Sequence, residues 1–410
     1  MSGKKPELLA PAGSLPLLKY AIAYGADAVY VGGKSYSMRG AAKNFTSEEL
    51  SEGLAFAHAR GKKVYVAANI VAKNEELDAF SAYVRELAAL GADAVIVSDP
   101  GLFAIAREEA PGLDVHISTQ AGVANWRTAQ FWRRLGAARV ILARELSMGQ
   151  VAEIAAHTDA EVEVFVHGAM CVSFSGRCLI SNYLAGRDAN HGACAQPCRW
   201  NYVLMEEKRP GEYLPVMEDG RGTFLYNSRD MCMISHIPAL VQAGVSSLKI
   251  EGRMKNELYV ATVVGAYRRE IDRYFADPDG YVPDPAMEAE VQKVSHRPYY
   301  TGFYFGNAGA DGQVYGSSSY LRPYEIAAVV KRYDAGTGIA VLEQRNRFFE
   351  GDTVEVLDPG AGVFCQKVTG LCDADGNPID AARHAQMAVR LRLDRPVGEY
   401  AILRRRREDG

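Results

Sequence analysis

Four cysteines lie close together in the sequence and carry its sharpest chemical signal. Cys171, Cys178, Cys194 and Cys198 follow the spacing C-x6-C-x15-C-x3-C. Structural zinc sites usually contain two close cysteine pairs, and only the second pair here fits that pattern. Four thiolates on a glycine-rich loop suit an iron–sulfur cluster, which needs four soft ligands. The spacing favours such a cluster over zinc or unligated thiols, with Cys232 as a possible substitute ligand.

Other familiar catalytic patterns are absent from the sequence. It contains no H-E-x-x-H, no G-x-S-x-G and no P-loop, and no Gly-x-Gly-x-x-Gly follows a predicted strand. Nothing pairs Cys171 with a base that would make it a nucleophile. His167 lies four residues before Cys171. It is a candidate donor to a cluster sulfur, a candidate substrate contact or a satisfied structural histidine, and these alternatives remain open.

A repeated unit predicts how these residues are positioned. The string GADAV occurs at 25–29 and again at 91–95, with weaker copies at 136–141 and 244–250. Each copy follows a helical pattern and opens a short apolar run typical of a buried strand. Strands that alternate with helices indicate a parallel sheet, and eight of them favour a (β/α)8 barrel over an open doubly wound sheet. The predicted strands start near Glu7, Asp27, Lys63, Asp93, Asp114, Arg139, Glu161 and Ser247.

In such a barrel, catalytic side chains lie at the carboxyl ends of the strands. Polar residues follow several of the predicted strands. Each of them can instead cap the barrel, and a cation there can form a structural ion pair with Glu145 or Glu251. The candidate catalytic residues are Gln120, His167 and Glu251, and the candidate substrate-binding residues are Asn69, Arg144, Arg177, Lys249 and Arg253.

The sequence divides into a barrel over 1–310 and a β module over 321–407. A long insertion at 167–246 separates the last two barrel strands, and insertions of this length are usually functional. It contains a predicted β-hairpin that pairs 202–205 with 223–226. The module shows short alternating strands at 325–330, 338–343, 352–357 and 387–393, which is typical of a small β-barrel. The arginine run 404–407 is predicted to be a solvated tail.

Composition excludes several classes of protein. The 410 residues include 48% hydrophobic and 23% charged residues, which excludes a disordered chain, and no apolar run is long enough to cross a membrane. The N-terminus lacks a signal-peptide pattern, so we expect a cytoplasmic protein with reduced thiols.

The net charge of −4 does not indicate a nucleic-acid-binding protein. Binding to RNA would therefore need local basic patches. Aromatic residues of the insertion could add stacking on an unpaired base. The candidate patches are 133–134, 268–269, 331–332 and 404–407, and the candidate stacking residues are Trp200 and Tyr202.

Several long motifs resemble peptidase family U thirty-two, the collagenase-like group. They are ELLAPAG at 7–13, YGADAVY at 24–30, HGAMC at 167–171, SGRC at 175–178, CAQPCR at 194–199 and LKIEGR at 248–253. The length and the β module are most similar to the branch of this family that hydroxylates tRNA. The resemblance implies 5-hydroxyuridine formation at the wobble position of the anticodon loop, without dioxygen. It also implies prephenate as oxygen donor and a [4Fe-4S] cluster on the four cysteines.

The resemblance and the chemistry of the residues agree on one point and leave two alternatives. Prephenate is a dicarboxylate, so its pocket needs guanidinium or ammonium donors such as those predicted at the strand ends. The family label keeps a peptidase as an alternative, although a peptidase needs an activated nucleophile or a metal-bound water. A non-catalytic RNA-binding or assembly factor with a structural cluster is the third interpretation.

Overall fold

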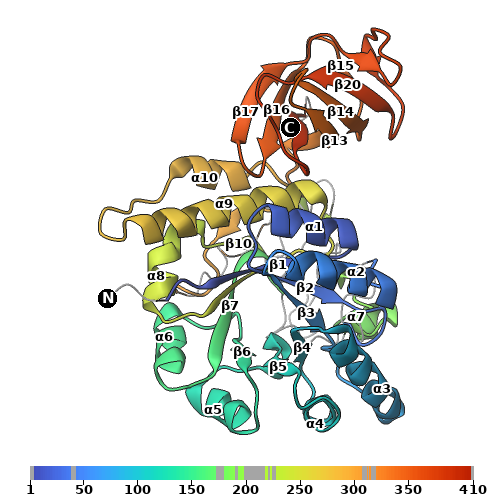
Figure 1. Ribbon diagram of the computed structural model, residues 1–410. Helices are drawn as coiled ribbons and strands as arrows, with labels where there is room; N and C mark the ends of the chain where they lie inside the picture. Colours follow the sequence, from blue (N-terminus) through green and yellow to red (C-terminus); the bar gives the residue numbers. More distant parts are fainter. Residues whose placement is uncertain are drawn as a thin grey trace.

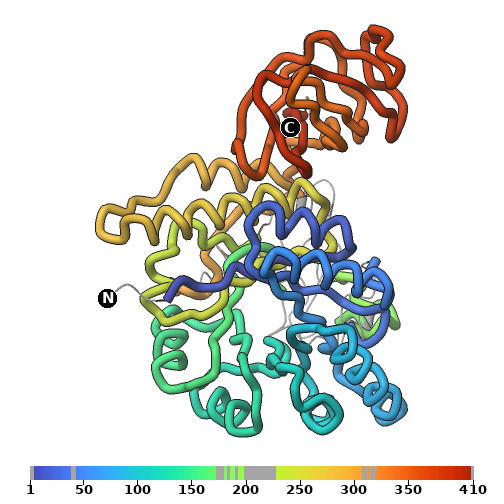
Figure 2. The backbone as a smooth tube through the Cα atoms, viewed as in Figure 1, coloured from blue at the N-terminus to red at the C-terminus, as the bar shows by residue number. Residues whose placement is uncertain are grey.

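The computed structural model describes residues 4–37, 43–171, 180–189, 193–197, 218–219, 222–223, 228–306, 312, 314 and 320–407. In these ranges the chain forms a parallel barrel and a separate antiparallel module that lies above it in the view of Figure 1. The tube in Figure 2 shows that the module follows the barrel in the chain and is its last part.

Eight parallel strands close the barrel. Each strand pairs with the next along the chain, and β11 closes the ring by pairing with both β1 and β7. These strands are β1 (Glu7–Pro11), β2 (Ala28–Gly32), β3 (Lys63–Ala67), β4 (Ala94–Val97), β5 (Asp114–Ile117), β6 (Arg139–Ile141), β7 (Glu161–Ala169) and β11 (Ser247–Ile250). The predicted (β/α)8 architecture is therefore confirmed.

Two strands of the structure begin one residue later than predicted, because the aspartate before each of them bonds to the neighbouring strand. Asp27 and Asp93 precede β2 and β4, and each turns its carboxylate to the neighbouring strand. The carboxylate of Asp27 accepts a hydrogen bond from the backbone N–H of Leu8 at 3.0 Å, and that of Asp93 accepts one from Val64 at 2.7 Å. The repeated aspartate of the GADAV string thus caps the start of the adjacent strand.

Helices cover the outside of the barrel. Local capping sets their starts: Thr46 and Glu49 form the capping box of α2, and Asn256 caps α9 through the N–H of Tyr259. The covering helices are α1 (Leu15–Ala23), α2 (Ser47–His58), α3 (Asn74–Leu90), α4 (Pro100–Glu109), α5 (Trp126–Arg134), α6 (Met148–Ala156), α8 (Ile237–Gln242) and α9 (Glu257–Ala276).

The long insertion and the segment that follows α9 contribute further elements beside the barrel. Strand β10 (Asp230–Cys232) pairs antiparallel with the end of β7, and β12 (Tyr299–Tyr300) pairs with β10. The strand at β10 is not predicted by the sequence pattern. Of the predicted hairpin, 202–205 lies outside the described residues, and Thr223 pairs with Glu218 through β8 (Glu218–Asp219) and β9 (Gly222–Thr223). Two short helices complete the list, α7 (Ile180–Ala185) and α10 (Pro285–Val291).

The C-terminal module is an antiparallel sheet with its own apolar core. Its strand order is β17-β16-β21-β13-β14-β20-β18, and a second pair joins β15 (Phe348–Phe349) to β19 (Ala381–Ala382). The strands of the larger sheet are β13 (Tyr324–Asp334), β14 (Ile339–Gln344), β16 (Thr353–Asp358), β17 (Gly362–Lys367), β18 (Cys372–Asp373), β20 (Ala388–Arg392) and β21 (Ile402–Arg406).

The arginine run is not a solvated tail, and that prediction is wrong. Its first three residues belong to β21, which pairs with both β13 and β16. The Arg404 side chain is fully buried, because its guanidinium bonds Glu290 of α10 at 2.6 Å and Glu355 of β16 at 2.7 Å. Two carboxylates at one point in the interior stabilise a buried guanidinium that would otherwise have to face water.

The module packs directly on the barrel. It lies over α1, α9 and α10 (Figure 1), and Val329, Leu357 and Ile402 of the module join the main apolar core. The hydroxyl of Tyr24 on α1 donates to the carbonyl of Leu357 at 2.9 Å. In the described part of the chain, no helix is long and apolar enough to cross a membrane.

Candidate active site at the barrel mouth

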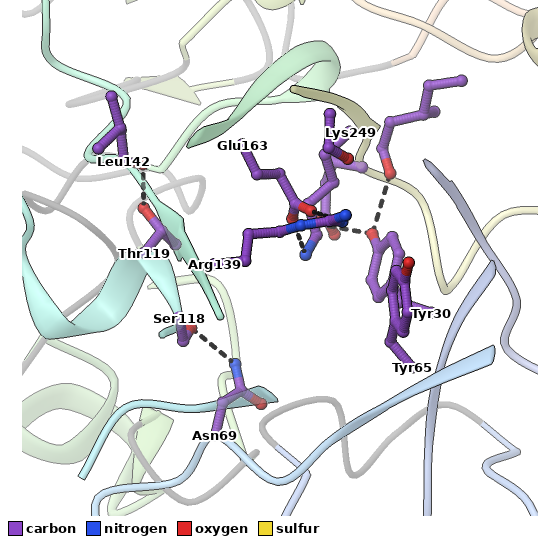
Figure 3. Close-up of polar contacts among 12 residues, drawn as sticks. Tyr30, Tyr65, Asn69, Ser118, Thr119, Arg139, Leu142, Glu163 and Lys249 are labelled. Atoms are coloured by element: carbon purple, nitrogen blue, oxygen red, sulfur yellow. Dashed lines mark hydrogen bonds and ion pairs between the residues drawn. The ribbon is translucent and has the colours of Figure 1, made fainter. Parts of the chain in front are cut away.

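Two of the predicted site residues meet at the carboxyl ends of β3 and β5. The amide nitrogen of Asn69 donates to the amide oxygen of Gln120 at 2.9 Å and lies 3.4 Å from the hydroxyl of Ser118. Gln120 belongs to a short 3-10 helix, Thr119–Ala121. The hydroxyl of Thr119, the first residue of this helix, donates a hydrogen bond to the carbonyl of Leu142 (Figure 3). The site therefore has two amide side chains in one hydrogen-bonded arrangement, which is suited to hold a planar polar ligand.

Arg144 and Glu251 come together at the same end of the barrel. Nη2 of Arg144 lies 3.7 Å from Oε2 of Glu251, and Nη1 donates to the carbonyl of Ala169 at 3.1 Å. The guanidinium lies over the ring of Phe165, 3.8 Å from its centroid. The hydroxyl of Tyr30 donates to the carbonyl of Ile250 at 3.0 Å and lies beside Glu251. Arg144 therefore forms the ion pair with Glu251 that the sequence leaves open as an alternative to substrate binding.

One donor of Arg144 has no partner in the part of the chain that the structure describes. Its Nε atom is buried and makes no hydrogen bond there. A buried guanidinium N–H without an acceptor is costly, so such a group is expected to meet water or a bound anion. Among the described site residues, this atom is the clearest indication of where an acidic ligand would bind.

Arg253 lies over the end of β2. Its Nη1 atom donates to the hydroxyl of Ser37 at 2.8 Å, and the side chain is almost fully buried. Gly32 makes this position possible, since a Cβ atom there would lie 2.2 Å from Nη1 of Arg253. Arg253 therefore joins the loop after β11 to the loop after β2.

The sequence predicts that Lys249 binds substrate at the barrel mouth, but its ammonium group is buried inside the barrel. Its Nζ atom is 2.8 Å from Oε1 of Glu163 and 4.4 Å from the ring centroid of Tyr30, inside the barrel (Figure 3). Arg139 bonds the other oxygen of Glu163 at 2.9 Å and also pairs with Glu7 at 2.7 Å. Burial would raise the pKa of Glu163, but the charges of Lys249 and Arg139 outweigh it and lower the pKa to about 2. This arrangement supports a structural role for Lys249.

Sequence reasoning missed this interior network. Its signal is present in the sequence, because Glu7, Arg139 and Glu161 are charged residues at the starts of three predicted strands. Nη2 of Arg139 lies 2.6 Å from Oε2 of Glu161. Charges at the amino ends of barrel strands indicate stability rather than catalysis.

His167 lies in an aromatic cluster outside the barrel ring. Its Nε2 atom is 3.1 Å from the hydroxyl of Tyr299, and its Nδ1 atom is 3.4 Å from that of Tyr267 on α9. The pairing of β7 with β11 shifts register between Lys249 and Ile250, and such a bulge re-aims the following side chain. Burial lowers the pKa of His167 to about 3, with a smaller contribution from the charge of Lys255. These contacts favour the structural alternative for His167.

The cysteines are described in part. Cys171 follows β7 and is exposed, and the half-buried Cys194 accepts a hydrogen bond from the backbone N–H of Gln196 at 3.4 Å. Cys178, Cys198 and Arg177 lie outside the described residues. Among the residues that are described, no three histidine, cysteine or carboxylate side chains group to hold a metal.

Cys232, the possible substitute ligand, fits a metal site less well than Cys171 and Cys194 do. Burial raises its pKa to about 11, and its sulfur lies 4.0 Å from the hydroxyl of Tyr267. Metals bind the thiolate, which this environment disfavours.

Comparison with known proteins adds the following matches. The model of peptidase family U32 matches residues 13–313, and that of the peptidase family U32 C-terminal domain matches 322–404. The tRNA hydroxylation protein P1 of Bacillus subtilis is 42% identical over 402 residues, which cover 98% of this chain and 95% of that protein. The tRNA hydroxylation protein P of Escherichia coli is 37% identical over 404 residues, covering 88% and 87%. A 23S rRNA 5-hydroxycytidine synthase of Escherichia coli is 36% identical over 272 residues, covering 66% and 40%.

Proposed function

The chain belongs to peptidase family U32, and from this premise we propose that it is an RNA-hydroxylating enzyme whose substrate is a uridine of tRNA. The observation that carries the proposal is the match to tRNA hydroxylation protein P1 along 98% of this chain and 95% of that protein. The match includes both the barrel and the C-terminal module, so it is not restricted to a common fold. The proposed product is 5-hydroxyuridine at the wobble position.

A [4Fe-4S] cluster on Cys171, Cys178, Cys194 and Cys198 is part of the proposal. Two observations support it. The exposed Cys171 follows β7 at the carboxyl end of the barrel, where catalytic groups of such barrels lie. The backbone N–H that donates to the sulfur of Cys194 is the kind of contact that tunes cluster thiolates. When bound, the cluster would supply Lewis-acid or one-electron chemistry.

The third part of the proposal is that prephenate is the oxygen donor. Replacing C5–H by C5–OH is a two-electron oxidation, so the donor must deliver an oxygen atom and accept two electrons. The mouth offers Arg144, whose buried Nε has no partner among the described residues, for one carboxylate of such an acid. Asn69 and Gln120 offer amide groups that can orient a uracil ring or the acid.

The family name keeps a peptidase as the alternative. A peptidase needs a nucleophile beside a base, or a metal-bound water. The histidine nearest to Cys171 in sequence, His167, has both ring nitrogens on tyrosine hydroxyls. This contact pattern favours the hydroxylase over a peptidase that would use His167 as its base. A non-catalytic RNA-binding or assembly factor is distinguished by the experiment below.

Deletion of the gene, followed by nucleoside analysis of bulk tRNA, tests the proposal. We expect 5-hydroxyuridine and its derivatives to disappear in a strain without a paralogue, and to return with the wild-type gene. Cys194→Ala should fail to restore them, whereas Cys365→Ala, which changes an exposed cysteine of β17, should restore them. Anaerobically purified protein should contain about four irons and four sulfides per chain. Unchanged 5-hydroxyuridine in the deletion strain would refute the assignment, and zinc in place of iron would refute the cluster.

A further inference from the structure

A groove runs between the barrel and the C-terminal module. It consists of two hollows of about 740 and 640 Å³ that share the start of α9 and the loop before it. Met254, Lys255 and Glu257 line both hollows, as does Arg345 of the module. We call these two hollows together the interdomain groove.

The interdomain groove is basic although the whole chain is acidic. Eight cationic and three carboxylate side chains line its described surface, whereas the chain as a whole has 46 cationic and 50 acidic residues. Lysine and arginine side chains come from both sides of the groove. The principal ones are Lys43 and Lys255 of the barrel and Arg322, Lys331, Arg345 and Arg407 of the module.

Several of these cations are exposed. Lys43, Arg322 and Arg407 are exposed, and Lys331 pairs with Glu343 at 3.0 Å while half of its side chain is exposed. Exposed pairs of this kind are weak and exchange readily for another anion. Arg345 differs, because it bridges Glu257 of the barrel and Glu343 of the module.

The groove is continuous with the barrel mouth. Its first hollow is lined by Gly13 of the loop after β1 and by Arg253, whose Nη1 atom bonds Ser37 of the loop after β2. A chain of phosphates that follows the groove from the module therefore arrives beside the carboxyl ends of β1, β2 and β11. This is the end of the barrel where the candidate active site lies.

We propose that the interdomain groove binds the phosphodiester backbone of the RNA substrate and leads it to the barrel mouth. The inference rests on the proposed function and names where its substrate is held. Tyr20 and Tyr400 line the first hollow, and Tyr320 and Tyr324 line the second. Cations interleaved with aromatic rings are typical of surfaces that bind single-stranded nucleic acid, since phosphates pair with the cations and bases stack on the rings. An acidic protein segment would use the cations alone.

A triple variant tests the groove. Lys331→Ala, Arg322→Ala and Arg407→Ala together remove three exposed cations that line it. We expect the Kd for a tRNA transcript to rise at least tenfold at about 0.15 M salt. The slope of log Kd against log salt should fall by about two, because each phosphate contact contributes roughly 0.7 to 0.9. An equal Kd and an equal slope for variant and wild type would overturn the proposal.

The matched control changes three exposed cations of the barrel that line neither hollow and belong to none of the candidate basic patches. Lys63→Ala changes the first residue of β3, Arg85→Ala lies on α3 and Arg127→Ala on α5, and both helices are far from the module in Figure 1. This control has the same change of net charge and should leave the Kd within about twofold. A loss of affinity as large as that of the groove variant would mean that total charge, not the groove, binds RNA.

Two further measurements separate the possible failures. A photo-crosslinking amino acid in place of Met254, which is 57% exposed and lines both hollows, should crosslink to tRNA in the otherwise wild-type protein. No crosslink, or displacement of tRNA by polyglutamate of equal charge, would overturn the RNA groove. If the wild-type gene restores 5-hydroxyuridine and the groove variant restores it equally well, the groove fails while the proposed function stands. If the wild-type gene restores none, the proposed function itself fails.

Discussion

Lys249 and Glu163 form a buried ion pair across β11 and β7, with 2.8 Å between Nζ and Oε1. Both side chains are almost completely withdrawn from water, and Arg139 holds the second oxygen of the same carboxylate. The centre of the barrel therefore contains a buried network of charged side chains rather than apolar side chains alone. The candidate active site rests on this network, because Lys249 lies under Tyr30 and Phe165, which in turn contact Glu251 and Arg144.

Glu163→Gln should destabilise the protein strongly. The substitution leaves Lys249 and Arg139 buried without their shared counter-charge, and breaking a buried pair in this way costs about 3–5 kcal/mol. Urea unfolding of wild type and variant measures the difference. Lys5→Met is the control, since Lys5 pairs with Asp272 at the surface and its loss should cost less than about 1 kcal/mol. Equal losses for the two variants would contradict the interior network.

The sequence predicts the barrel more reliably than it predicts the side chains at its mouth. The GADAV repeat and the apolar runs place all eight strands, because both depend on local backbone preferences. Lys249 and Ile250 are adjacent in the sequence. The side chain of Lys249 nevertheless faces Glu163 inside the barrel, whereas Ile250 is the last residue of the strand. His167 is turned away by a register shift that depends on β11, which lies far along the chain.

Arg404 shows the same limit in the module. Four consecutive arginines are typical of a solvated segment, and only the folded chain brings Glu290 and Glu355 to one of them. Long-range pairing of this kind leaves no periodic signal in the sequence. For the same reason, the sequence places Asn69 and Gln120 at the ends of two strands but does not show that their side chains are hydrogen-bonded to each other.

His167 should make stability depend on pH. Burial holds its pKa near 3 in the folded protein, whereas an unfolded histidine has a pKa near 6.5. Between these values the unfolded state binds more protons, so the free energy of unfolding falls as pH falls from 6.5 towards 3. The contribution of this one group is at most about 5 kcal/mol.

His167→Phe should remove that part of the pH dependence. Phenylalanine keeps an aromatic ring beside Tyr267 and Tyr299 but cannot be protonated. Urea unfolding at pH 5 and pH 7 should show a smaller difference for the variant than for wild type. Phe131→Leu, which changes an exposed ring of α5 that carries no ionisable group, should leave the difference unchanged. A wild-type pH slope in His167→Phe would show that the ring is not buried in its neutral form.

Arg144→Met should weaken binding of the proposed acidic co-substrate without affecting RNA binding. The variant removes the guanidinium over Phe165 and its unpartnered Nε donor, while methionine fills much of the space. Loss of one charged hydrogen bond to a carboxylate costs about 1.5–3 kcal/mol, so KM for prephenate, the proposed oxygen donor, should rise roughly 10- to 150-fold. Steady-state hydroxylation of a tRNA transcript measures this change.

Arg144→Lys completes the test of that site. Lysine keeps the charge but lacks the planar fork, so KM should lie between wild type and Arg144→Met. The Kd for tRNA should be the same in all three proteins, because Arg144 does not line the interdomain groove. A parallel loss of tRNA affinity in both variants would argue against a pocket for the small acid at this position.

Arg404→Met should uncouple the module from the barrel. The guanidinium is the meeting point of Glu290 of α10, Glu355 of β16 and the hydroxyl of Thr262 on α9, 3.2 Å from Nη1. Without it, two carboxylates remain close together at the interface. We expect a loss of about 3–5 kcal/mol and a second, earlier unfolding transition in calorimetry. Limited proteolysis should release the module faster than in wild type.

A residue two positions further along the same strand provides the control for this interface. Arg406 belongs to the same strand but is exposed, so Arg406→Met should leave the unfolding temperature and the proteolysis rate close to those of wild type. If Arg404→Met unfolds in one transition at an unchanged temperature, the buried arginine does not hold the two parts together. If the interface does depend on it, the same variant should also raise the Kd for tRNA, because Lys331 and Arg345 would no longer face Lys255 across the interdomain groove.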